Sequence, residues 1–429
     1  MCHFAARVIP ALLIAVVAAA VRAEDWPNFR GPTGMGLSAS KGLPLTWGGP
    51  KAENVLWKAP LLTTDDKVRH DMNQASPIVS GGLAFVTMSY WPSTATTKDF
   101  PEHHVIAFDA ATGKRLWDTA VEHGPWLLND LRGGYTAPTP AADAKHVYVL
   151  FGSAVVAALD RKGAVVWRKD IKPHAFDVAI GTSPVLYRDT LLVICEMSTG
   201  SRLIAFDTAT GDIKWSRDRK GSDWTHSTPV SAKIGGKDQL LVAAAQALQG
   251  LDLATGEILW FARLPDQPKT RIGDAPSPVY GAGVVYIDSG RGGPGIAVDP
   301  TGSGDVTATH VKWKAPNIAG DSLSSAVIVG DYLYRLQAQG ILKCYKLPEG
   351  ELQYSERLQE ALAAVSPVAT ADDRIYLASG GKSYVVRSGP TFEILGSSTL
   401  SDPSNASPAI ANNRLFVRGK TNLYCIGAP

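Results

Sequence analysis

The sequence predicts an all-β fold, an eight-bladed β-propeller of four-stranded antiparallel blades that is closed by its N-terminal strand. Two repeated patterns lead to this prediction. The first joins alternating apolar residues, an Asp, a Thr-Gly turn and a Trp, as in residues 106–117 and 204–215. The second is a Ser/Thr-Pro pair that returns after about 45 residues. Repeats of 40–50 residues with strand periodicity and no helical period are typical of propeller blades.

Each copy of the first pattern predicts a strand, a tight turn and a second strand. Alternating apolar residues before the Asp suit a strand with one buried face. Asp and Thr hydrogen-bond to the turning backbone, and Gly supplies the positive φ of the turn. The Trp on the second strand is expected to pack between neighbouring blades. The repeated tryptophans are Trp57, Trp117, Trp167, Trp215, Trp260 and Trp313.

The second pattern marks the start of each unit, where Pro is tolerated because the first residue of a strand needs no ladder N–H. In the unit that begins at Ser183, strands are expected at residues 183–186, 190–195, 203–207 and 213–217. Ser325 is followed by Ala326 instead of Pro, and still fills its slot in the series. The eight copies begin at Ser76, Thr139, Ser183, Thr228, Ser277, Ser325, Ser366 and Ser407.

The two ends of the propeller, residues 54–429, are expected to share the last blade. The final unit ends with a third strand at residues 423–426, and residues 55–58 carry the Trp of the missing fourth. Because an open sheet edge invites aggregation, the N-terminal strand should complete the eighth blade. Two insertions, at residues 90–104 and 300–309, are expected to lengthen blades one and five.

Two segments precede the propeller. Arg7 and the apolar run after it, with small residues near position 23, predict a secretory signal peptide over residues 1–23. The alternative is a membrane anchor, but the run is short for a span and contains Pro10. Residues 24–53 are rich in Pro and Gly and predict an ordered extended arm, since Trp26 and Phe29 would be costly to leave in water.

Composition narrows the classes of partner. Of the 42 basic residues, Arg7 and Arg22 precede position 24, which leaves 40 against 40 acidic residues. A neutral chain without basic runs gives no support for a nucleic-acid partner. Cys195, Cys344 and Cys425 are widely spaced in apolar strands and are expected to be buried and unpaired. We expect an exported monomer, periplasmic or extracellular.

Function is expected where the repeat breaks. The loops that precede the first strand of each unit gather at one end of the central channel, the mouth, and differ between blades. Three arginines there favour an anionic or carboxylate-bearing ligand, unless aspartates such as Asp130 and Asp223 pair with them. An ordinary solvated rim is the alternative. The candidate ligand-binding residues are Arg132, Tyr135, Asp177, Trp224, His226, Arg271, Asp274 and Arg291.

No catalytic or metal-binding residue is predicted. His103 and His104 on the first insertion could ligate a metal. The pair has no recognised metal spacing, and we interpret both as surface histidines.

The repeat resembles that of the pyrroloquinoline quinone (PQQ)-type propellers. The A-x-D-x-x-T-G-x-x-x-W phrase is similar to the repeat of quinoprotein alcohol dehydrogenases. It is closer to that of the propeller lipoprotein of the outer-membrane β-barrel assembly machinery. The opening D-W-P-N-F-R-G-P at residues 25–32 is similar to the start of exported PQQ-like propellers of planctomycetes.

This resemblance implies an exported, non-catalytic binding or assembly scaffold. Its mouth would hold a protein partner or a small polar ligand, and a partner could bring it peripherally to the outer membrane. Two alternatives stay open, a PQQ-dependent oxidoreductase with PQQ and calcium, and a carbohydrate-binding propeller. The adjacent cysteines that the dehydrogenases place beside their cofactor are missing from this sequence, which counts against the first alternative.

Overall fold

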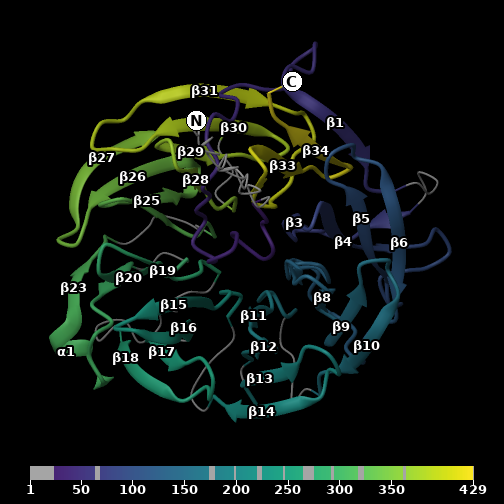
Figure 1. Ribbon diagram of the computed structural model, residues 1–429, viewed down its shortest axis with the longest axis horizontal. Helices are drawn as coiled ribbons and strands as arrows, with labels where there is room; N and C mark the ends of the chain where they lie inside the picture. Colours follow the sequence, from purple (N-terminus) through teal and green to yellow (C-terminus); the bar gives the residue numbers. More distant parts are fainter. Residues whose placement is uncertain are drawn as a thin grey trace, which may run out of the picture.

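The structure is a computed structural model that describes residues 24–62, 68–172, 179–197, 200–219, 225–244, 247–263, 275–290, 294–316, 323–360 and 364–428. Within them eight sheets surround a central axis, and the chain passes through them in order (Figure 1). The described part contains one short α-helix, α1 (Thr307–His310), and one 3-10 turn, η1 (Ala338–Gly340). The prediction of an all-β, eight-bladed propeller is confirmed.

Each blade begins with a short inner strand and ends with a strand on the outer wall. Blade 1 comprises β3 (Ile78–Ser80), β4 (Leu83–Trp91), β5 (Glu102–Asp109) and β6 (Arg115–Val121), and blade 2 comprises β7 (Ala141–Ala142), β8 (His146–Phe151), β9 (Val155–Asp160) and β10 (Val165–Asp170). Blade 3 comprises β11 (Val185–Tyr187), β12 (Thr190–Cys195), β13 (Arg202–Asp207) and β14 (Ile213–Asp218), and blade 4 comprises β15 (Val230–Ile234), β16 (Lys237–Ala244), β17 (Ala247–Asp252) and β18 (Ile258–Arg263). Blade 5 comprises β19 (Val279–Gly281), β20 (Val284–Ile287), β21 (Ile296–Val298) and β23 (Val311–Lys314), and blade 6 comprises β24 (Val327–Val329), β25 (Tyr332–Gln337), β26 (Ile341–Lys346) and β27 (Glu351–Arg357). Blade 7 comprises β28 (Val368–Thr370), β29 (Arg374–Leu377), β30 (Lys382–Arg387) and β31 (Ile394–Thr399), and blade 8 comprises β32 (Ala409–Ala411), β33 (Arg414–Arg418), β34 (Asn422–Ile426) and β1 (Val55–Pro60).

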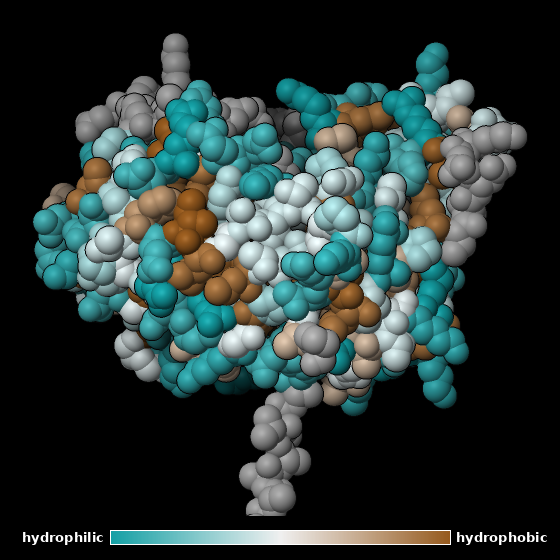
Figure 2. Space-filling view, turned by 90° about the horizontal axis from the view of Figure 1, so that it is seen from above, coloured by the Kyte–Doolittle hydropathy of each residue, from teal (hydrophilic) through white to brown (hydrophobic). Residues whose placement is uncertain are grey.

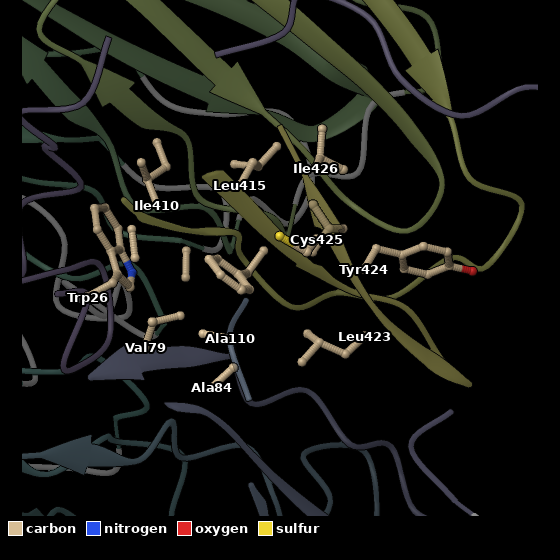
Figure 3. Close-up of a cluster of buried hydrophobic side chains, with 14 of the residues drawn as sticks. Trp26, Val79, Ala84, Ala110, Ile410, Leu415, Leu423, Tyr424, Cys425 and Ile426 are labelled. Atoms are coloured by element: carbon tan, nitrogen blue, oxygen red, sulfur yellow. The ribbon is translucent and has the colours of Figure 1, made fainter. Parts of the chain in front are cut away.

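The last blade is built from both ends of the chain, as predicted. β1 pairs antiparallel with β34 and places Trp57 opposite Cys425. A buried apolar cluster continues across this seam, where Trp26, Val79 of blade 1 and Ile410 of blade 8 meet (Figure 3). The closing strand therefore leaves no open edge between the first and last blades.

The arm, residues 24–53, crosses the axis on the side toward which the inner strands run. Trp26 forms a bridge with Val79 of blade 1, and Leu37 forms one with Ala369 of blade 7. In Figure 1 this purple segment passes through the middle of the molecule. Arg30 of the arm is buried, and its Nη2 donates to the carbonyls of Met35 and Ala326 at 3.1 and 2.5 Å. Burial lowers the pKa of the Arg30 guanidinium to about 9.

On the outer side, neighbouring blades meet through an indole that covers a turn glycine. Trp167 of blade 2 lies over Gly211 of blade 3, and its Nε1 donates to the carbonyl of Thr208 at 3.0 Å. A Cβ added to Gly211 would lie 2.6 Å from the indole, so the turn needs Gly for close approach as well as for its φ of +71°. The same Trp-over-Gly contact pairs Trp57 with Gly113, Trp117 with Gly163, Trp215 with Gly256 and Trp313 with Gly350.

Among the described residues, the junction of blades 4 and 5 lacks this Trp-over-Gly contact. Trp260 is fully buried, and its Nε1 donates to Gln239 within its own blade at 2.8 Å. The second insertion lengthens the connection between β21 and β23 of blade 5, as expected. Its short strand β22 (Gly304–Asp305) also pairs in parallel with β18 and adds a fifth strand to blade 4. The first insertion extends the β4–β5 hairpin, beside which β2 (Arg69–His70) also pairs with β4.

The outer wall is largely hydrophilic in the side view, with apolar residues in separate patches (Figure 2). Ile213 and Ile258, at the start of outer strands, are among the exposed apolar side chains. Cys195, Cys344 and Cys425 are buried and free, as expected. No helix in the described ranges has the length and apolar character needed to cross a membrane.

Candidate functional site

Around the axis, a closed ring of hydrogen bonds joins the eight blades. The backbone N–H at the start of each blade donates to the hydroxyl oxygen at the same position of the next blade, at 2.9 to 3.2 Å. The last bond runs from Ser407 back to Ser76. We call these residues the hydroxyl ring: Ser76, Thr139, Ser183, Thr228, Ser277, Ser325, Ser366 and Ser407.

The ring explains the Ser/Thr of the second repeated pattern. Ser183 donates its N–H to the Thr228 hydroxyl and does not join a ladder, so β11 begins at Val185, two residues after the predicted start. Ser325 keeps its place in the ring although Ala326 replaces the usual Pro. The hydroxyl, more than the Pro, is therefore the feature that all eight blades need.

An axial cavity of about 330 Å³ lies inside this ring. Seven of the eight ring residues line it, all except Ser277. The residue two positions before each ring residue also lines it, because alternate residues of an extended chain face the same side. We call these residues the second tier: Gln74, Ala137, Gly181, His226, Ala275, Leu323, Ala364 and Asn405.

The arm closes the cavity on the side opposite the mouth. Phe29 lines the cavity and is half-buried, whereas the neighbouring Arg30 is fully enclosed. Arm residues bond to positions that follow the ring residues in the chain, such as Val79 after Ser76. The axial order is therefore second tier, hydroxyl ring, then arm, with an aromatic floor.

Two charged residues from the loop before blade 2 stand at the mouth and line the cavity. Arg132 donates to both oxygens of Asp130, with Nε at 3.0 and 2.9 Å and Nη2 at 2.5 Å. These hydrogen bonds lower the pKa of Asp130 to about 2. The side chain of Arg132 is 84% exposed. The two charges compensate each other, as the sequence left open.

His226, which precedes blade 4, reaches the cavity because Gly181 at the same position of blade 3 has no side chain in its way. A Cβ on Gly181 would lie 2.3 Å from Nδ1 of His226, so only glycine leaves room for the imidazole. The charge of His226 also acts on Asp130 and helps to keep its pKa low. Asp130, Arg132 and His226 thus form one polar group at the cavity wall.

The other predicted site residues divide into two groups. Tyr135 is fully buried and does not line the cavity; its hydroxyl accepts from the N–H of Leu128 at 2.9 Å, and its ring meets Trp91 edge-on. Its own N–H donates to Asp71 at 2.6 Å. The remaining predicted residues lie outside the described residues: Asp177, Trp224, Arg271, Asp274 and Arg291.

The interpretation of the first insertion's histidines as surface residues is wrong. His103 is buried, and its ring nitrogens lie 2.8 Å from the hydroxyls of Ser89 and Ser153. Desolvation lowers its pKa to about 3. His104 is partly buried between Asp118 and Glu102. In the described part of the chain, no group of three or more His, Cys, Asp or Glu is placed to hold a metal ion.

Comparison with known proteins identifies the family. The family model described as outer membrane protein assembly factor BamB matches residues 50–171 and 101–355. The chain belongs to this family. BamB of Yersinia pestis is 22% identical over 346 residues, which cover 68% of this chain and 82% of that protein.

Members of the wider PQQ-like group also match. The quinoprotein ethanol dehydrogenase of Pseudomonas aeruginosa is 31% identical over 199 residues, which cover 43% of this chain. The matched part is 29% of that dehydrogenase, so the chain spans less than a third of it. A solved europium-containing methanol dehydrogenase superposes with a TM-score of 0.68 at 11% identity, covering 90% of this chain and 87% of that chain. This likeness shows the fold.

Sequence reasoning missed most of the second tier. The predicted site residues are mostly charged or aromatic and lie several positions before a ring residue, whereas the cavity is lined by the residues two positions before each one. Gln74 and Asn405, and the small residues Ala137 and Gly181, were therefore not chosen. The available signal was strand alternation counted back from the Ser/Thr of each repeat.

Proposed function

We propose that this protein is an exported, non-catalytic binding scaffold that holds a partner at the mouth, above the axial cavity. The observation that carries the proposal is the contrast between the two rings of the cavity wall. The hydroxyl ring is the same in every blade and joins the blades, whereas the second tier changes from blade to blade. A wall that varies on a fixed frame is suited to recognition.

The family relationship supports this proposal. The BamB of Yersinia pestis, whose name states a role in outer membrane protein assembly, aligns over most of its own length. A protein partner is accordingly the first expectation for the mouth. Export is part of the same proposal and would bring the chain to the compartment where outer membrane proteins assemble.

Photocrosslinking tests the position of the partner. A photoreactive phenylalanine derivative replaces Arg132 at the mouth in one variant and Ile213, 60% exposed on the outer wall, in a matched control. We expect adducts of defined mass from position 132 in cells and none from position 213. Equal adduct formation at both positions, or none at position 132, would contradict a partner at the mouth.

A PQQ-dependent oxidoreductase is the second candidate, favoured by the 31% identity to the ethanol dehydrogenase. PQQ carries three carboxylates, which need cationic or N–H donors. Among the described lining residues the one arginine is Arg132, and Asp130 already binds it in a bidentate manner. The described lining therefore fits PQQ poorly. Titration calorimetry with PQQ and calcium, beside an alcohol oxidation assay, tests this candidate.

A further inference from the structure

The ligand chemistry of the axial cavity follows from its hydrogen-bonding capacity, its charge and its floor. A hydroxyl has one donor and two acceptor positions. In the hydroxyl ring the backbone N–H of the preceding blade occupies one acceptor position of each oxygen. Each ring residue thus retains an O–H and a lone pair, and seven of these residues line the cavity. Such a wall can both donate to and accept from one ligand.

The second tier adds carboxamides on one side of the cavity. Gln74 of blade 1 and Asn405 of blade 8 belong to adjacent blades. Nε2 of Gln74 donates to the carbonyls of Arg132 and Gly133 at 3.1 and 3.2 Å, which fixes the amide and leaves Oε1 as an acceptor. On the opposite side, Leu323 and Ala275 are apolar. The second tier is thus polar at blades 8 and 1 and again at blade 4, where His226 lies, and apolar at blades 5 and 6.

The charge of the described lining is balanced apart from one imidazole. Asp130 is its one carboxylate and Arg132 its one guanidinium, and they form the bidentate pair described above; His226 is the remaining lining residue that can carry a positive charge. An anion entering the cavity would compete with Asp130 for the guanidinium. An uncharged ligand meets no such competition, and the ring hydroxyls and carboxamides suit it better.

The floor is aromatic and only partly covered. Phe29 of the arm is half-buried although it lies at the axis, so part of its surface is available to a ligand. The C–H face of a sugar ring is apolar and its hydroxyls point outward, which matches an aromatic floor with a hydrogen-bonding wall. The volume of about 330 Å³ is near the lower end of the roughly 300–1,000 Å³ usual for small-ligand pockets.

We propose that the axial cavity binds a small uncharged saccharide of one or two rings. The hydroxyl ring and the carboxamides of Gln74 and Asn405 would bind its hydroxyl groups, and Phe29 would contact its apolar face. This inference rests on the proposed function, because it assigns the ligand that the scaffold holds below its mouth.

Saturation-transfer NMR and titration calorimetry on the mature protein test the proposal, with glucose, N-acetylglucosamine and maltose as probes and citrate as the anionic comparison. We expect saturable binding of at least one saccharide with a Kd below about 1 mM, and none of citrate. Gln74→Ala should weaken binding about tenfold, the loss of one good hydrogen bond. Ala137→Phe, which fills the cavity, should abolish binding while the melting temperature stays near that of the parent.

Gln353→Ala, on the outer strand β27, is the matched control for Gln74→Ala and should leave binding unchanged. The proposal is overturned if none of the three saccharides binds at about 10 mM, if citrate binds more tightly, or if Ala137→Phe binds as the parent does. These outcomes are separate from the crosslinking at position 132. A scaffold with a protein partner but no saccharide would still give adducts there, whereas a saccharide-binding protein without a partner would not.

Discussion

The blades of this propeller are joined differently at the outer wall and at the axis. At the wall, an indole such as Trp167 covers a turn glycine of the next blade so closely that a Cβ on the glycine would lie 2.6 Å from the ring. At the axis, the joint is a chain of hydrogen bonds through the hydroxyl ring, and the oxygens keep free donor and acceptor positions. The outer joint leaves no space for a ligand, whereas the inner joint is also the wall of a cavity.

This difference between the outer and inner joints shows how one repeated unit can serve both the stability of the ring and the binding of a ligand. The outer joint uses residues that are fully occupied by packing, so it has no capacity left for binding. The inner joint uses hydroxyls, which can bond to the next blade and still bond to a ligand. Four predictions test this division, from the largest expected effect to the smallest.

Removal of residues 24–61 should have the largest effect, because the outer joint between blades 8 and 1 closes through this segment and the arm also lies beneath the hydroxyl ring. It carries β1 with Trp57, and it also contains the buried Trp26 and Leu61. Its loss exposes the edge of β34, and we expect a destabilisation above about 5 kcal/mol, more than single substitutions usually cause. Urea unfolding against a chain that begins at residue 24 measures it. An unchanged midpoint would show that seven blades and three strands of the eighth are stable without this segment.

Gly211→Ala should be the most damaging single substitution of the four tests. The positive φ costs a non-glycine residue about 1–2 kcal/mol. The contact with Trp167 at 2.6 Å adds an overpacking cost of about 1–3 kcal/mol. Gly82→Ala is the matched control, since Gly82 has a similar φ of +78° and open space around it. Equal losses of stability in both variants would show that the contact with the Trp167 indole contributes nothing to the cost of the substitution.

The side chain of His103 lies between blades 1 and 2, where its ring nitrogens meet the hydroxyls of Ser89 and Ser153. Its titration should make the free energy of unfolding depend on pH. Its folded pKa of about 3 lies below the ordinary value of 6.5, so below pH 6.5 the unfolded chain binds a proton that the folded chain does not. Stability is then lost as the pH falls from about 6.5 toward 3, by about 2 kcal/mol between pH 7 and 5. Comparison with His103→Asn in denaturant melts isolates this loss, because the carboxyl groups titrate in both proteins. Parallel pH profiles would contradict it.

Substitutions in the hydroxyl ring should have the smallest effects on stability. The size of the effect should depend on whether the substituted residue lines the cavity. Ser277 does not line the cavity. Ser277→Ala removes the oxygen that accepts the N–H of Thr228, and we expect the free energy of unfolding to fall by about 1–3 kcal/mol. Ser366→Ala removes the acceptor of the Ser325 N–H at the cavity, where water can replace it, and we expect about 1 kcal/mol or less. Chemical denaturation of both variants compares them, and a larger loss for Ser366→Ala would reverse the proposed division.

The repeats were sufficient to predict the architecture. The Thr-Gly turns, the tryptophans and the spacing of the Ser/Thr pairs gave eight blades and the closure of blade 8 by β1, because each repeat must bury its faces against neighbours. The prediction that the two histidines of the first insertion lie at the surface was wrong for the opposite reason. His103 and His104 have no periodic context, and only the packing of blade 1 against blade 2 decides that His103 is buried.

The sequence by itself therefore determined the number of blades, the turns and the closing strand, since these depend on local patterns that recur along the chain. Only the tertiary structure decided that the ring hydroxyls bond from blade to blade, that Gln74, His226 and Asn405 face one cavity, and that Phe29 forms its floor. These contacts join residues that lie 40 to more than 300 positions apart. No local pattern states which of them meet at the axis, because that depends on how the closed ring turns each inner strand toward its centre.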